Sequence, residues 1–170
     1  NSNHLRTMLG NCDVVTPLTF PEHPIGYRFE IYPYRSALWQ KFLVENYNDS
    51  SIVRYQWEEY GLEFATGENV SLYSIYNNSI LRATNNEFDL ERAIVNYGIW
   101  RYFSGERYMN NQHFAEGNYY CTSKTFTVNE ISSIFSENGS SYLIDLPNET
   151  NNILIETAIP GLINMHYLEI

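Results

Sequence analysis

The chain has 170 residues, enough for one domain with a buried core. It carries 20 Asp and Glu against 10 Lys and Arg, which gives a formal net charge of -10, and its only lysines are Lys41 and Lys124. Partners with phosphate backbones or anionic headgroups need clustered Lys and Arg, so nucleic acid and anionic membranes are excluded as expected partners. No apolar run approaches the ~20 residues of a membrane span. We expect a folded, acidic domain, because 16% aromatic residues is far above the content of disordered chains.

Short segments typical of β-strands follow a lead-in at residues 1–16. They are rich in Tyr, Phe, Ile and Val, and chain-breaking residues separate them about every 8–14 positions. Leu38–Val44 fits either a strand or a short helix. The segments of the first half are Tyr27–Tyr32, Leu38–Val44, Ile52–Trp57, Leu62–Ala65, Val70–Tyr76 and Ser79–Arg82, with a turn at Asn77–Asn78.

One segment, Phe88–Tyr97, has the pattern of a helix. Asn86 is the predicted N-cap, and Asp89 and Glu91 fall in the first turn, where the helix dipole favours carboxylates. Gly98 weakens any extension beyond this range.

The second half returns to the pattern of short strands. A hairpin is expected at Ile99–Tyr108, turning on Ser104–Gly105. Further strands are expected at Tyr119–Val128, Tyr142–Leu146 and Ile153–Ala158. The sequence therefore predicts a mostly β fold, an antiparallel sandwich with one helix at Phe88–Tyr97.

Motifs for catalysis, metal binding or cofactor binding are missing from the sequence. His113 and Glu116 fit a chance pair of surface residues, because two ligands cannot fill a metal site. Cys121 is expected to be a buried, inert thiol, and a bridge from it to Cys12 stays open. We therefore expect no catalytic residues, no metal and no cofactor.

The abundant aromatic residues favour a binding role over catalysis, since aromatic rings stack on sugars and on proteins. The largest of them are expected in the core, namely Trp39, Trp57 and Phe29. Tyrosines with polar neighbours fit core and surface equally well: Tyr102, Tyr108, Tyr119 and Tyr120.

Four collinear segments carry a resemblance to a known family. They are Thr16–Pro33 (TPLTFPEHPIGYRFEIYP), Leu38–Gly61 (LWQKFLVENYNDSSIVRYQWEEYG), Ile99–Tyr120 with its Tyr-Tyr pair, and Tyr142–Leu162 (YLIDLPNETNNILIETAIPGL). In this order and spacing they resemble the glycan-binding head of the rotavirus outer-capsid spike protein, of a distant type outside group A.

This resemblance implies a galectin-like sandwich of two antiparallel sheets over residues 17–162, followed by a tail or linker at 163–170. It also implies a place on the virion surface, in the outer capsid, as part of a longer spike protein. The expected partners are host cell-surface glycans, the remainder of the spike protein and neutralising antibodies. The implied function is attachment to a host cell, without any reaction.

The resemblance also suggests which residues bind the glycan. Leu38 stands where sialic-acid-binding members have an arginine, and Cys121 stands where they have a serine. We therefore expect a neutral or blood-group-type glycan rather than sialic acid. The expected glycan-binding residues are Arg35, Trp39, Arg54, Tyr102, Tyr119 and Tyr120.

Two other functions remain open from the sequence. Asn164–Ile170 (NMHYLEI) resembles the last strand of jelly-roll carbohydrate-binding modules of secreted glycosidases. A small hydrolase would need two surface carboxylates brought together by the fold; acidic pairs such as Glu58–Glu59 lie on opposite faces if they are in a strand.

Overall fold

The computed structural model describes residues 2–27, 36–67, 69–109, 112–127 and 144–145. These residues are mostly helical, so the predicted galectin-like β-sandwich is wrong. The elements in chain order are α1 (Ser2–Leu9), α3 (Ala37–Tyr47), α4 (Ser51–Ala65), α5 (Leu72–Ala83), α6 (Leu90–Tyr102), the 3-10 turns η1 (Gly105–Arg107) and η2 (Gly117–Tyr119), and the strands β1 (Phe126–Thr127) and β2 (Ile144–Asp145).

The segments predicted as strands mostly lie inside helices. Leu38–Val44, which fitted either a strand or a short helix, lies in α3, so its helical alternative is confirmed. The two segments from Ile52 to Ala65 form α4, and α5 runs through the expected turn at Asn77–Asn78. Among the described residues, strands are limited to β1 and β2, which pair in parallel over two residues each. Residues 28–32 and 153–158 lie outside the described residues.

The spacing of buried residues explains the error. Tyr, Ile and Val favour strands by propensity, but propensity yields to the period of the hydrophobic pattern. The buried residues recur every three or four positions, as a helix face requires. In α3 they are Leu38, Trp39, Phe42 and Leu43, and in α6 they are Leu90, Ala93, Tyr97, Gly98 and Arg101.

The predicted helix at Phe88–Tyr97 is confirmed as α6, with different ends. Its N-cap is Asp89, whose Oδ1 accepts a hydrogen bond from the Arg92 N–H at 2.9 Å, and not Asn86. It continues through Gly98 to Tyr102. The expected hairpin of residues 99–108 is therefore wrong.

The chain does turn at Gly105, which has a positive φ of 60°. A Cβ at this position would lie 2.4 Å from the Thr122 nitrogen, so only glycine fits without displacement of the backbone.

The hydrophobic core lies where α3 and α6 pack together. Trp39 is 1% exposed, as predicted, and its ring meets the Tyr97 ring edge-on at 5.1 Å. Phe42 contacts the same Tyr97 ring from α3, at 5.3 Å between ring centroids. Ile52 and Ile80 extend this core toward α4 and α5.

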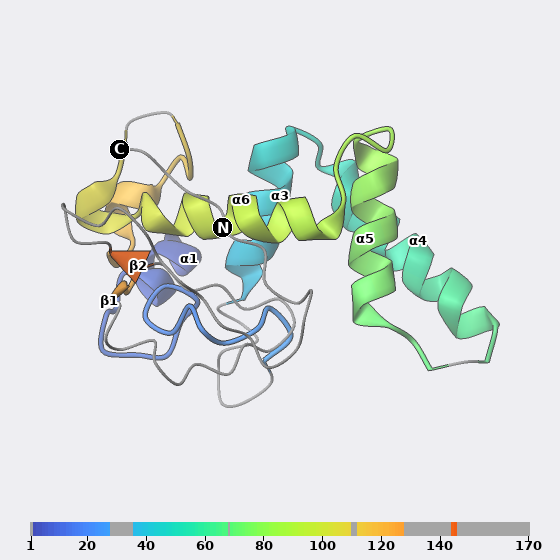
Figure 1. Ribbon diagram of the computed structural model, residues 1–170, viewed down its shortest axis with the longest axis horizontal. Helices are drawn as coiled ribbons and strands as arrows, with labels where there is room; N and C mark the ends of the chain where they lie inside the picture. Colours follow the sequence, from blue (N-terminus) through green and yellow to red (C-terminus); the bar gives the residue numbers. More distant parts are fainter. Residues whose placement is uncertain (1, 28–35, 68, 110–111, 128–143, 146–170) are drawn as a thin grey trace.

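The helix α6 runs through the middle of the molecule and separates two ends (Figure 1). At one end, α4 and α5 pack along each other as a helical hairpin. At the other end lie α1, the 3-10 turns and the short β1–β2 pair. The last turns of α4 lie at the outer edge of the molecule.

The N-terminal segment, expected to be a lead-in, packs onto the domain. Leu9 at the end of α1 is fully buried in the core, and its carbonyl accepts a hydrogen bond from the Cys121 N–H at 2.9 Å. Cys12 and Cys121 form a disulfide with Cα atoms 5.5 Å apart. The expectation of a free thiol at Cys121 is therefore wrong, although the residue is buried.

Candidate functional site

Those residues predicted to bind glycan that the structure describes do not come together. Trp39 and Tyr120 are buried, and Arg35 lies outside the described residues. Tyr102 is half-buried beneath the Arg107 guanidinium, 4.5 Å from the ring centroid.

Arg54 and Tyr119 are both exposed, but they lie at opposite ends of α6. Arg54 is on α4 and pairs with Glu58 at 3.6 Å. Tyr119 is in η2, and the Arg6 guanidinium lies 4.3 Å above its ring. The five of these residues that the structure describes therefore do not form one site.

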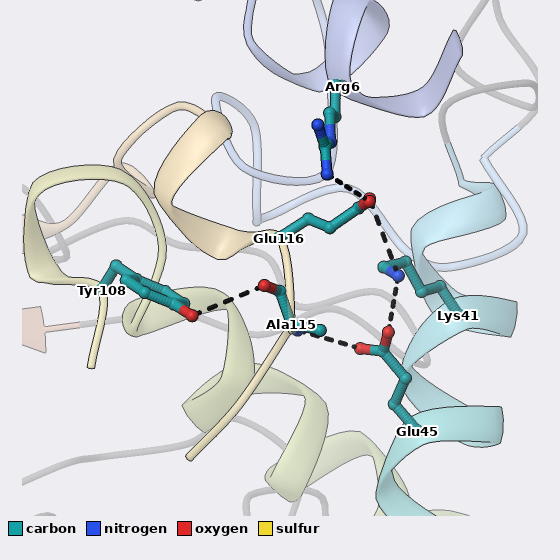
Figure 2. Close-up of polar contacts among 6 residues, drawn as sticks. All are labelled: Arg6, Lys41, Glu45, Tyr108, Ala115 and Glu116. Carbon is teal, nitrogen blue, oxygen red and sulfur yellow. Dashed lines mark hydrogen bonds and ion pairs between the residues drawn. The ribbon is translucent and has the colours of Figure 1, made fainter. Parts of the chain in front are cut away.

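A network of charged side chains joins α1, α3 and the segment before η2 (Figure 2). Arg6 Nη2 donates to Glu116 Oε1 at 2.8 Å, and Lys41 Nζ lies 3.9 Å from Glu116 Oε2. Lys41 also pairs with Glu45, one helical turn along α3. Glu45 Oε2 in turn accepts from the Ala115 N–H at 3.4 Å.

This network has the properties of a structural clamp. Cations and carboxylates alternate in it, so each carboxylate is engaged by a positive charge. Burial, together with the nearby carboxylates of Glu116 and Glu45, raises the pKa of the Tyr120 phenol above its usual range. The Tyr120 phenol therefore stays neutral beside the network. The ion pairs themselves hold α1, α3 and the segment before η2 together.

The expected chance pair of His113 and Glu116 has separate surroundings. Glu116 belongs to the charged network, while the His113 ring stacks on Phe103 with centroids 4.4 Å apart. Burial lowers the pKa of His113 below its usual value, which favours the neutral ring. No group of three metal-ligating side chains occurs within the part of the chain that the structure describes.

The most exposed aromatic surface lies on α4, and we call Trp57, Tyr60 and Phe64 its aromatic face. Trp57 is 72% exposed, Tyr60 43% and Phe64 66%. The three rings form a continuous row, with centroids 6.3 Å apart from Trp57 to Tyr60 and 6.0 Å from Tyr60 to Phe64. Trp57 was expected in the core, and that prediction is wrong.

Two adjacent faces of α4 explain this exposure. Ile52 and Gln56 are the buried residues of α4, and this side packs toward α5 and the core. Trp57, Tyr60 and Phe64 follow at intervals of three and four residues, so they share the neighbouring face. The spacing of these three aromatic residues is present in the sequence, but it indicates a shared face only if the segment is a helix.

The charges around the aromatic face differ along α4. At its middle, Glu58 pairs with Arg54 at 3.6 Å and with Arg82 of α5 at 2.7 Å. The last turn of α4 contains no basic residue. There Glu63 Oε2 accepts from the Ser71 N–H at 2.7 Å. The outer end of α4 is therefore apolar and negative, since the helix dipole adds to the charge of Glu63.

No helix within the described ranges is long and apolar enough to cross a bilayer.

Comparisons with known proteins give no relative for this chain. No family model matches the sequence, and neither the curated proteins nor the solved structures contain a match. The expected relation to the rotavirus spike head therefore stays a prediction.

Proposed function

We propose that this is a non-catalytic binding domain, and that the aromatic face of α4 is its contact surface. The observation that carries the proposal is the row of three neighbouring exposed rings on one helix. The same fold buries other large aromatics completely, such as Phe42 and Phe114. Exposed apolar patches on soluble domains mark interaction sites.

The size of the face supports this role. Large aromatic side chains have about 150–250 Å² of surface each, so at their exposed fractions the three rings together expose roughly 270–450 Å². Leu62, which is also exposed, adds to this area. The largest apolar patch on a typical monomer is about 300–600 Å² and often functional.

Attachment to glycans, the function implied by the resemblance, stays a second candidate. The support for glycan binding is the chemistry of the exposed side chains on α4, and it does not require a β-sandwich. Exposed Trp and Tyr rings can stack on the C–H faces of sugars. Arg54, one of the predicted glycan-binding residues, lies three positions before Trp57 on the same helix and can donate hydrogen bonds to hydroxyls. The glycan site that we propose as this second candidate therefore lies on α4.

The place of action and the remaining partners are part of the same proposal. Disulfides persist in oxidising environments, so the Cys12–Cys121 bridge supports a role outside the reducing cytosol. This agrees with the expected position on a virion surface. Association with a longer spike protein and recognition by neutralising antibodies stay predictions.

The test compares the wild-type protein with the double variant Trp57→Ala/Phe64→Ala, using a glycan array and chemical unfolding. Both side chains are mostly exposed, so the free energy of unfolding should change by no more than about 0.5 kcal/mol. Glycan binding by the wild type should be lost in the double variant and kept in Tyr119→Ala, which removes an exposed ring at the other end of the molecule.

Two results would contradict the proposed function. Destabilisation of the double variant by more than about 2 kcal/mol would show that the rings belong to the folded core, because such losses are typical of core truncation. Release of product from a glycan substrate would show that the domain is catalytic.

Equal glycan binding by the wild type and the double variant would contradict only the second candidate, because it would exclude α4 as the glycan site.

A further inference from the structure

We propose that the aromatic face of α4 pairs with the same face of a second copy of this chain, in an antiparallel, two-fold symmetric dimer. This inference rests on the proposed function, in which the face is a contact surface. It names the partner that the spacing, the charges and the shape of α4 favour.

The spacing of apolar residues on α4 is that of a helix-pairing seam. Val53, Trp57, Tyr60 and Phe64 follow one another at intervals of four, three and four residues. Alternating intervals of three and four are the a and d positions of a coiled coil, which one helix offers to another. Val53 is partly buried against the core, so the seam begins at the body of the domain and runs outward.

The charges along α4 favour the antiparallel orientation. Arg54 is exposed at the beginning of the seam, and the end of the seam has Glu63, the negative end of the helix dipole and no basic residue in its last turn. Antiparallel pairing places Arg54 of each copy beside the negative end of α4 in the other copy. Two-fold symmetry forms this contact twice.

Gly61 gives an independent indication of a close neighbour. It lies inside α4, where glycine is less favourable than alanine by about 1 kcal/mol. A Cβ built on Gly61 would meet no atom within 4 Å in the described part of the chain, so packing within the domain does not require a glycine here. Arg54 and Gly61 are seven residues apart and occupy the same flanking position of the heptad. In antiparallel pairing these positions face each other, so the bare backbone at Gly61 leaves room for the Arg54 side chain.

The available area implies a weak dimer. If the seam and its flanking residues are covered on both copies, the interface buries on the order of 1,000 Å² in total, at the lower end for specific complexes. The net charge of -10 on each copy also opposes association. We expect a dissociation constant on the order of 10 μM at 0.15 M salt.

The experiment is sedimentation velocity of the 170-residue chain between about 1 and 300 μM at 0.15 M salt, a range chosen to span the affinity expected from the interface area. The wild type should pass from monomer to dimer over this range. Trp57→Ala and Phe64→Ala should each weaken the dimer by about tenfold or more, because each removes a large ring of the seam. Tyr119→Ala is the matched control, since it removes a 53% exposed ring far from α4 and should leave the dissociation constant within about twofold.

Two further variants separate pairing from folding. Gly61→Met should raise the melting temperature, because methionine is a better helix former than glycine, and should weaken the dimer by about tenfold by filling the room beside Arg54. Arg54→Glu should also weaken the dimer, since it places a carboxylate beside the negative end of the other α4.

A wild-type chain that stays monomeric at 300 μM would overturn the inference, as would a dimer whose affinity is unchanged in Trp57→Ala and Phe64→Ala. The inference would also be overturned if the chain remained monomeric and its aromatic face bound a synthetic amphipathic, Lys-rich helix. In that case the partner of the face would be another protein. These outcomes leave the proposed contact surface standing; only the destabilisation or catalysis described above rejects it.

Discussion

At the scale of single residues, Arg101 is the most unusual group in the core. It lies in the last turn of α6 and is 2% exposed. Its Nη1 donates to the carbonyl oxygens of Pro17 at 2.9 Å and Pro21 at 3.3 Å, and its guanidinium lies 4.6 Å from the Tyr97 ring centroid. A charged side chain thus fixes the N-terminal loop to α6 by satisfying carbonyls that would otherwise be buried without donors.

Replacing this arginine should be strongly destabilising. Arg101→Met keeps most of the apolar volume but removes the donors, and we expect a loss of about 2–4 kcal/mol in urea unfolding because the two carbonyls lose their partner. Arg92→Met on the same helix is the control, since Arg92 is exposed and a surface change there should alter stability by no more than about 0.5 kcal/mol. Equal stability of the two variants would mean that the Arg101 hydrogen bonds contribute nothing net.

Residue type alone could not separate the buried from the exposed aromatics. Trp39 and Trp57 are the same residue type in segments rich in apolar residues, and both were expected in the core. One fills the centre of the core and the other is 72% exposed. Trp39 lies on the inner face of α3 and Trp57 on the outer face of α4, so the difference depends on helical phase.

At the scale of elements, α6 was predictable, α3 was predicted only as one of two alternatives, and the other helices were not predicted. Its sequence has acidic residues in the region of its first turn and apolar residues at helical spacing. In α3, α4 and α5, aromatic and β-branched residues dominate, and their strand propensity concealed the helical period. Tertiary packing against a common core decided these segments, as it does for most helices in proteins.

The N-cap of α6 offers a direct measure of local contributions to this helix. Asp89→Ala should destabilise the domain by about 1 kcal/mol, because the Arg92 N–H loses its acceptor and the first turn loses a favourable charge. Ser50→Ala at the start of α4 is the control, since the Ser50 side chain makes no capping hydrogen bond. The two free energies of unfolding should differ clearly; a Ser50→Ala loss as large as that of Asp89→Ala would contradict this account.

At the scale of the whole molecule, several contacts hold the N-terminal segment against the far end of α6. The disulfide joins residues 109 positions apart, and the Arg6–Glu116 pair and the Arg101 hydrogen bonds act between the same regions. The sequence does not specify this bridge, because two cysteines without a spacing signature do not define a pairing. The resemblance that implied a β-sandwich depended on the order and spacing of similar residue types along the chain. This order carries no information about such long-range contacts.

Reduction of the disulfide should lower stability substantially. Closing a loop of about 100 residues restricts the unfolded chain by roughly 4–5 kcal/mol in the chain-entropy model. We expect a lower melting temperature in the presence of a reductant, and a similar decrease for the double variant Cys12→Ser/Cys121→Ser without it. Adding the reductant to the double variant should change nothing. An unchanged melting temperature on reduction of the wild type would contradict the expected contribution of the bridge.

The Cys12–Cys121 bridge also makes the enclosed chain a covalent ring. The exposed end of α4, near Gly67, lies on this ring, outside the core. A single proteolytic cut there opens the ring without releasing either half. A nicked molecule would therefore migrate as one species under oxidising conditions and separate into two chains only after reduction.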